Sequence, residues 1–206
     1  MLASLKTFDQ SSFWFINSNH NGFFDHFFSI ITYFGTGWVV APTLLFFVFT
    51  KIPAAKRASL IVFSLIVLIA SGLINSQIKH LLHTPRPLTV FAKEQKAIGD
   101  NTPIGTQSVC RKAIHIVGKE LAEDSFPSGH TNTAFSAATL MVLCFGRFFW
   151  PSLLVAGMVG YSRVYIGAHF PSDVIAGALL GAIVVLMGFL LFNRLSRKGT
   201  PQHDQQ

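Results

Sequence analysis

Histidines, basic residues and a carboxylate gather in three short clusters, and the last of these has the spacing of an acid–base pair. The stretch SRVYIGAHFPSD, from Ser162 to Asp173, places Arg163, His169 and Asp173 within eleven residues. Asp173 follows His169 by four residues, so a bend in the chain can bring its carboxylate to one imidazole nitrogen. That contact would fix the tautomer of His169 and raise the basicity of its other nitrogen. In the alternative interpretation, Asp173 only caps a helix that begins near Pro171.

The second cluster, SFPSGHTNTAFSAATL, has the composition of a helix start that binds an anion. Ser128 can serve as the N-cap, and Gly129 lets a ligand approach the free backbone N–H groups of the first turn. His130 would lie in that turn and point toward the bound anion. The alternative is a capped helix whose histidine only makes a local hydrogen bond. Small residues follow at positions that predict close helix packing: Ala134, Ser136, Ala137 and Ala138.

The first cluster, KHLLHTPRPL, supplies two more cations. Lys79 ends an apolar helix, and Arg86 follows seven residues later between two prolines that stop the helix. Taken alone, these residues are typical of a lysine that extends to the membrane surface and an arginine that anchors the chain there. Together with Arg163, however, three cations without matching carboxylates need an anion, and the oxygens of a tetrahedral phosphate would satisfy them. Two histidines then suit a reaction with one nucleophile and one proton donor.

Apolar segments make up much of the chain and predict an all-α polytopic membrane protein. Half of the 206 residues are hydrophobic and 12% are charged, against about 25% charged residues in soluble domains. Several apolar runs approach the ~20 residues that cross a bilayer. Two close glycines, Gly35 and Gly37, favour two short spans in place of one long span there. The expected helix bundle has six spans, at about 22–35, 37–50, 57–79, 131–149, 150–168 and 171–193.

Basic residues at the span ends predict which side of the membrane each loop faces. With six spans they fall on one side, which should be the cytoplasm; they are Lys51, Lys56, Arg57, Arg147, Arg194, Arg197 and Lys198. All three clusters then lie on the opposite side. The single membrane domain, 1–206, would contain an interfacial segment at 8–20, an extracytoplasmic loop at 80–128 and a disordered polar tail at 196–206.

The net charge and the cysteines restrict the possible partners. A formal net charge of +7 would suggest nucleic acid for a soluble chain, but here it predicts contact with anionic lipid surfaces or an anionic substrate, and no nucleic acid. Cys110 and Cys144 lack the spacing of metal ligands, and their polar and apolar settings argue against a disulfide. The first residues lack the order of a cleavable signal, so we expect the N-terminus to be retained.

Taken together, the three clusters resemble the signature of the type 2 phosphatidic acid phosphatase (PAP2) superfamily, which also contains the vanadium haloperoxidases and bacterial acid phosphatases. That signature is Lys, six residues, Arg-Pro; then Pro-Ser-Gly-His; then Ser-Arg, five residues, His, three residues, Asp. The sequence matches it at every position, in KHLLHTPRP, PSGH and SRVYIGAHFPSD. The resemblance covers roughly residues 56–195, and the three parts in this order and spacing are highly specific.

The resemblance implies a role for each matching residue. His169 is implied as the nucleophile that becomes a phosphohistidine, Asp173 as the group that orients it, and His130 as the general acid and later the base for water. The implied phosphate ligands are Lys79, Arg86, Ser128, Gly129 and Arg163. No metal and no cofactor are implied. This agrees with phosphoryl transfer in which fixed cations stabilise charge on the equatorial oxygens, as metal ions do elsewhere.

The predicted function is that of an integral-membrane lipid phosphatase in a bacterial inner membrane, with its active site facing the periplasm or the outside. The resemblance implies phosphatidylglycerophosphate, phosphatidic acid, undecaprenyl diphosphate or lipid A phosphates as substrates, and the residues do not choose among them. Loop cations expected to contact the headgroup are Lys93, Lys96, Arg111 and Lys112. Two alternatives stay open: a vanadate-dependent haloperoxidase, whose known members are soluble, and a non-enzymatic phospholipid-binding or transport protein, which would not need both histidine and aspartate.

Overall fold

The computed structural model describes residues 2–99, 114–118 and 122–198, and this part of the chain is helical, with no strand in it. The helices in chain order are α1 (Leu2–Asn17), α2 (Gly22–Ile31), the 3₁₀ helix η1 (Thr32–Gly35), α3 (Gly37–Lys51), α4 (Ala54–Leu82), α5 (Pro87–Gly99), α6 (Gly129–Phe145), the 3₁₀ helix η3 (Arg147–Phe149), α7 (Pro151–Tyr165) and α8 (Pro171–Lys198). The predicted all-α fold class is confirmed.

Helix α6 lies at the centre of the bundle and contacts α3, α4, α7 and α8. Small residues bring α6 and α8 together, because a Cβ atom at Gly177 of α8 would collide with the backbone oxygen of Ser128. Further along the same two helices, Leu140 and Val185 are buried in the largest apolar cluster. This packing holds the start of α6 against the start of α8, which are the positions of two of the three sequence clusters.

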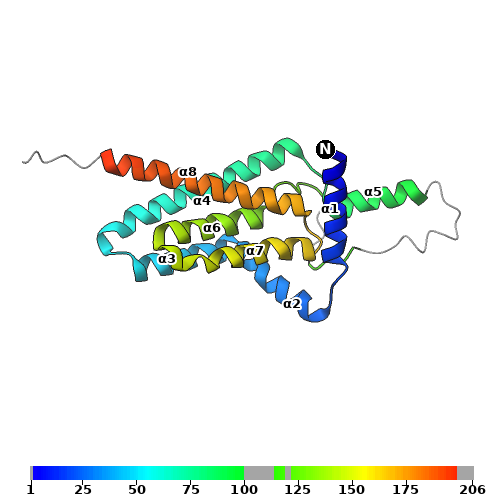
Figure 1. Cartoon of the computed structure of the whole chain (residues 1–206), viewed down its shortest axis with the longest axis horizontal. Coiled ribbons are helices and arrows are strands. Elements are labelled where there is room, and N and C mark those ends of the chain that lie inside the picture. Colours follow the sequence, from blue (N-terminus) through cyan, green and yellow to red (C-terminus); the bar gives the residue numbers. More distant parts are fainter. Residues whose placement is uncertain (1, 100–113, 119–121, 199–206) are drawn as a thin grey trace, which may run out of the picture.

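The bundle has two distinct ends (Figure 1). The α3–α4 link, the α6–α7 link and the C-terminal end of α8 lie at one end, which therefore carries Lys51, Arg57, Arg147 and Arg194. The other end carries α1, α5 and the turn between α7 and α8. The three sequence clusters all lie at this second end, opposite the basic residues at the span ends.

Six full-length spans are not found, and the reason is helix length. Among the described residues, two helical segments are long and apolar enough to cross a membrane alone: Ala54–Glu94 and Pro171–Ser196. Helices α6 and α7 have 17 and 15 residues, which correspond to ~25 and ~22 Å of helix. Both are shorter than the ~30 Å hydrocarbon layer. Helix α6 is largely buried within the bundle, whereas α7 exposes apolar side chains such as Leu154 on its outer face.

The two short spans predicted at 22–35 and 37–50 are instead one bent unit. Gly22–Gly35 and Gly37–Lys51 qualify as a span only as a pair, with a bend of 63° between them. Helix α2 alone has 10 residues, about 15 Å of helix, and cannot cross by itself. As a consequence, α1 does not lie beside Lys51 as six spans would require; it packs on α7 and α8 at the opposite end.

Helix is present in the predicted extracytoplasmic loop and at the start of the predicted disordered tail. The loop predicted at 80–128 includes α5, which begins at Pro87, and the tail predicted at 196–206 begins inside α8, which continues to Lys198. Proline at the first helical position of α5 fits this outcome. Cys110 and the rest of the tail lie outside the described residues.

Candidate active site

His169 and Asp173 face each other across the start of α8, and a serine lies between them. His169 Nδ1 is 3.5 Å from Asp173 Oδ2, which is longer than a good hydrogen bond. Ser125 Oγ donates to Asp173 Oδ2 at 2.5 Å and lies 3.4 Å from His169 Nδ1. Because the serine proton points to the carboxylate, its oxygen lone pairs can accept from the Nδ1–H of the ring. The ring is thus oriented by a serine–aspartate pair.

His169 is 2% exposed, and this burial lowers the pKa of its imidazole below the ordinary value, although Asp173 acts in the opposite direction. The ring is therefore neutral at pH 7. Its Nε2 atom lies 3.4 Å from Nη1 of Arg86, a group that can only donate a proton. With Nδ1 protonated toward Ser125, the lone pair of Nε2 points toward the cations of the site, which is the arrangement that a nucleophile for phosphorus requires.

Asp173 also fixes the first turn of α8. Its Oδ2 accepts the backbone N–H of Phe170 at 2.9 Å, as a carboxylate at the third helical position does in a capping box. Asp9 of α1 completes the helix start by accepting the N–H and the hydroxyl of Ser172 at 2.8 and 2.6 Å. Asp173 therefore has both of the roles considered from the sequence. It caps α8, and it also faces His169 and the serine between them.

Arg86 and Lys79 are held by backbone carbonyls. Arg86 donates from Nε to Glu123 O at 2.7 Å and from Nη1 to Ala168 O at 3.0 Å. Lys79 Nζ donates to Asp124 O at 2.6 Å. Carbonyl oxygens orient these two cations without cancelling their charge, so both remain available to an anion.

Arg163 ends α7 with a buried guanidinium whose hydrogen bonds are incomplete. Its Nη1 donates to Thr32 Oγ1 of η1 at 2.9 Å, and its side chain is almost fully enclosed, since the residue is 7% exposed. The Nε atom has no partner among the described residues. A buried, unpaired N–H on a charged group is costly unless a ligand completes it, so this atom indicates an anion site.

The second sequence cluster forms the start of α6, as predicted. Ser128 precedes the helix, but its side chain does not cap it; the hydroxyl accepts from Thr131 Oγ1 at 3.0 Å instead. Its backbone N–H donates to Asp173 O at 2.9 Å, which ties α6 to α8. The first-turn N–H groups after it, from Gly129 onward, have no carbonyl within the helix to bond. No hydrogen bond of the described residues uses the His130 side chain, which leaves it available to a ligand.

The immediate site contains three cations, Lys79, Arg86 and Arg163, and one buried carboxylate, Asp173. Among the described residues, no ion pair involves Lys79, Arg86 or Arg163. A pocket of about 150 Å³ adjoins Arg163 and Ala168. The site therefore combines unneutralised cations, helix-start N–H groups and a neutral buried histidine, an arrangement that suits a tetrahedral anion.

A profile of the PAP2 superfamily matches residues 60–197, which is more than half of the chain and includes every residue of the three clusters. The chain belongs to the PAP2 superfamily. The family resemblance drawn from the three clusters is confirmed.

Relatives within the PAP2 family match this chain to different extents. The undecaprenyl-diphosphatase BcrC of Bacillus subtilis is 35% identical over 79 residues, 38% of this chain and 39% of that protein. The lipid A 4'-phosphatase of Bacteroides thetaiotaomicron is 25% identical over 204 residues, 96% of this chain and 83% of that one. The chain spans less than two fifths of the length of BcrC and of other relatives matched over similar stretches.

The crystal structure of Aquifex aeolicus LpxE superposes on this PAP2 chain with a TM-score of 0.68 and 26% identity, covering 89% of this chain and 95% of that one. The shared fold and the apolar helices α4 and α8 make this chain an integral membrane protein. The alternative of a soluble haloperoxidase does not fit these spans.

Some residues of the PAP2 site were not found from the sequence. Ser125 lies two residues before the Pro-Ser-Gly-His motif, and Thr32 is 131 residues away from the arginine that it contacts. Neither has a motif of its own; the only signal for Ser125 is that it is a small hydroxyl residue at the start of the second cluster. The side chain of Lys96, and residues Arg111 and Lys112, lie outside the described part of the chain, while Lys93 is exposed on α5.

Part of the expected headgroup loop is fixed over Arg163. Asn17 of α1 accepts the N–H of His115 at 3.0 Å and donates to its carbonyl at 2.8 Å. Asp25 of α2 accepts from Tyr165 and contacts His115 Nε2, both at 2.8 Å. These bonds hold residues 114–118 against the end of α7, where Ile116 and Val117 line the pocket beside Arg163.

Proposed function

We propose that this protein is a membrane lipid phosphatase that removes a phosphate from a lipid monoester or diphosphate. The observation that carries the proposal is the buried Arg163 with its unpaired Nε atom, in one site with two further cations that have no carboxylate partner. An anion with several oxygens in a tetrahedral arrangement satisfies all of these donors at once. The neutral His169 beside them supplies the nucleophile.

In the proposed reaction, the cations hold the phosphate while Nε2 of His169 attacks phosphorus. The P–N bond forms as the bond from phosphorus to the leaving oxygen breaks, and His130 gives its proton to that oxygen. His130 then takes a proton from water, whose oxygen attacks phosphorus and releases inorganic phosphate from the histidine. Asp173 and Ser125 keep the proton on Nδ1 throughout, so Nε2 stays the attacking atom.

The substrate is proposed to be a lipid because the site lies at one end of a membrane bundle, where headgroups reside. Relatives of this chain include an undecaprenyl-diphosphatase and a lipid A 4'-phosphatase. Phosphatidylglycerophosphate and phosphatidic acid offer the same chemistry, a phosphate at the membrane surface on a hydrocarbon anchor. The proposal therefore covers these four classes, with the bilayer as the surrounding medium and no metal or cofactor in the reaction.

Release of inorganic phosphate by purified protein in detergent tests the proposal. We expect turnover with at least one lipid from a panel of the four classes, in the presence of chelator and without added metal. A binding or transport protein would release no phosphate from any of them. Activity that disappears in chelator and returns with Mg²⁺ would contradict the cation-based mechanism.

Ser125→Ala is expected to lower kcat about tenfold to a hundredfold while KM changes little. The hydroxyl bonds a charged carboxylate, and such bonds contribute ~1.5–3 kcal/mol, here to the orientation of the nucleophile and not to phosphate binding. Ser125→Thr keeps the hydroxyl and should recover most of the rate. Steady-state kinetics of both variants, beside Ser71→Ala as a buried serine away from the site, check this. Equal kcat for Ala and wild type, or a threonine variant no faster than alanine, would show that Ser125 does not position His169.

The active site is proposed to face the periplasm or the outside of a bacterial inner membrane, because the opposite end of the bundle carries the basic span ends. In a Cys110→Ser, Cys144→Ser background, Ala92→Cys on α5 should react with an impermeant thiol reagent in intact cells. Ala55→Cys, at the other end of the bundle, should react only after lysis. The reverse labelling pattern would refute this orientation.

A further inference from the structure

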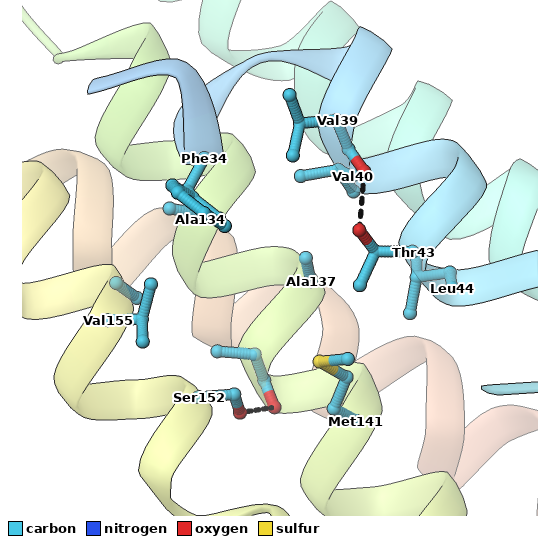
Figure 2. A pocket seen from close by; sticks show the side chains of 12 residues that line it. Phe34, Val39, Val40, Thr43, Leu44, Ala134, Ala137, Met141, Ser152 and Val155 are labelled. Carbon is cyan, nitrogen blue, oxygen red and sulfur yellow. Dashed lines mark hydrogen bonds between the residues drawn. The ribbon is translucent and has the colours of Figure 1, made fainter. Parts of the chain in front are cut away.

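An apolar pocket of about 190 Å³ lies between the bent α2–α3 unit and helices α6 and α7. Figure 2 shows its walls: Leu44 of α3 on one side, Val155 of α7 on the opposite side, Ala137 of α6 between them, and Phe34 of η1 next to Ala134. The alanines of α6 were predicted as packing positions, and here their small side chains also leave this space open. An enclosed apolar cavity of ~150 Å³ accommodates a benzene ring, so this pocket has room for a short length of hydrocarbon.

The polar groups of the pocket are turned to the backbone. Thr43 Oγ1 donates to Val39 O at 2.7 Å, and Ser152 Oγ donates to Phe149 O at 2.6 Å. A longer contact of Ser152 with Ala138 O, at 3.4 Å, is drawn in Figure 2 together with the Thr43 bond. Since both hydroxyls are satisfied within the protein, what the pocket offers a ligand is hydrocarbon surface, and its ligand is an apolar chain.

The pocket begins next to the residue proposed as proton donor. His130 and Ala134 are one turn apart on α6 and share a face of the helix. The helix break lies against the same turn, since a Cβ atom at Gly35 would come within 2.7 Å of His130 O. From His130 to Met141, the last α6 residue on the pocket wall, the helix rises ~16 Å.

The same 3₁₀ turn contacts the phosphate site. Thr32, at the start of η1, accepts the hydrogen bond from Arg163, and Phe34, two residues later, lines the pocket. The turn η1 therefore lies between a charged site at Arg163 and an apolar site along α6. An amphiphile bound here has its phosphate in the first site and its chain in the second. No water-soluble phosphate ester would use the second of these.

We propose that this pocket binds the part of the substrate's hydrocarbon chain nearest to the phosphate, and that it makes the protein select lipid phosphates over water-soluble phosphate esters. The inference rests on the proposed function and adds a chain-binding site to it. The occupant is one acyl or isoprenyl chain of the substrate. The alternative occupant is an unrelated bilayer lipid. In that case the rate of phosphate release would not depend on the pocket, so kinetics distinguish this alternative from binding of the substrate's own chain.

A second groove on the other side of α3 is the rival position for the chain. It has a volume of about 270 Å³ and is lined by α3, α4 and α6, including Leu65 and Ile69. Polar side chains form part of its wall: Asn132, Thr133 and Ser136. Asn132 and Ser136 are both hydrogen-bonded to Ser71, so this groove also offers mainly hydrocarbon surface. The pocket at Val155 is favoured because η1, which lines it, also contacts Arg163 of the phosphate site.

The test fills each space with a tryptophan side chain. Val155→Trp fills the proposed pocket, Leu154→Trp adds the same side chain to the neighbouring, outward-facing position of α7, and Ile69→Trp fills the rival groove. For each purified variant, kcat/KM is measured with a long-chain lipid phosphate and with p-nitrophenyl phosphate. We expect Val155→Trp to lose about tenfold or more with the lipid, the effect of roughly two displaced methylene groups, and less than about twofold with the aryl ester. Both other variants should match the wild type.

Equal losses of Val155→Trp on both substrates, or no loss on either, would overturn the proposal. A loss confined to the lipid in Ile69→Trp would assign the chain to the other groove and overturn it as well. If Val155→Trp does not fold, Thr43→Phe fills the pocket from α3, with the outward-facing Leu45→Phe as its matched control.

A separate measurement tests the pocket even if the proposed function fails. If the wild type releases phosphate from no lipid of the four-class panel and not from p-nitrophenyl phosphate, the function is wrong, and a long-chain alkyl phosphonate with a diazirine near its headgroup is used as the probe. Crosslinks to the pocket-lining positions of α6 or α7 that decrease in Val155→Trp would support the chain-binding site. Crosslinks at Leu65 or Ile69, or none that depend on the variant, would overturn it.

Discussion

His169→Ala is expected to abolish phosphate release while the protein still inserts and folds. The variant removes the protein side chain that forms a covalent bond to phosphorus in the proposed reaction, and losing a nucleophile costs far more than losing a positioning contact. We expect kcat to fall by more than about 10³-fold. Folding should survive because Arg86 keeps its bonds to Glu123 O and Ala168 O, and Asp173 keeps its bond to Phe170.

The control for this variant is His26→Ala, an exposed histidine of α2 away from the cations. It should keep wild-type kcat. Size-exclusion profiles and thermal unfolding of both variants show whether a loss of rate is a loss of structure. Near wild-type turnover in folded His169→Ala protein would remove the histidine from the reaction.

His130→Ala is expected to slow the enzyme to an extent that depends on the leaving group. The variant keeps the nucleophile and the cations but loses the proton donor, and a general acid contributes about 10²–10⁴-fold. Alkyl lipid monoesters should show a loss of this size, because an alkoxide is a poor leaving group without protonation. p-Nitrophenyl phosphate and diphosphates should lose much less, because their leaving oxygens are stable as anions.

The measurement is kcat/KM of wild type and His130→Ala on p-nitrophenyl phosphate and on a lipid monoester. The ratio of the two losses carries the information, since a general disturbance of α6 would slow both substrates alike. Equal slowing would therefore contradict the acid role of His130, and His169→Ala, expected to fail on both substrates, is the matched comparison.

The site was predictable from the sequence wherever its residues carry their own local signal. Pro171 and Asp173 mark the start of α8, and the Pro-Ser-Gly-His run marks the start of α6; the structure has both helices begin there. The clusters could be placed at one end of the bundle because apolar run lengths and the basic span ends fix which loops share a side. This placement does not depend on the number of spans before Lys51, which was predicted wrongly. Replacing two short spans by one bent unit leaves unchanged the direction in which each helix after Lys51 runs.

The parts that escaped prediction depend on contacts between distant segments. Nothing near Thr32 indicates that it meets Arg163, and nothing near Asn17 indicates that it holds His115. The 63° bend follows from how Gly35 packs on the first turn of α6, and an apolar run with two glycines is compatible with a kink, a bend or two helices. Such features are decided by tertiary packing, which local spacing does not encode.

The central claim is that phosphate passes through a covalent bond to His169, and trapping that bond tests it most directly. Wild-type protein is mixed with substrate, quenched within milliseconds in alkaline denaturant, which preserves phosphohistidine, digested and analysed by mass spectrometry. We predict a phosphorylated peptide that contains His169, absent from His169→Ala and present at a higher level in His130→Ala with an aryl phosphate, because the histidine that activates water is missing. Active protein that never carries phosphate on His169, or carries it on another residue, would contradict the account.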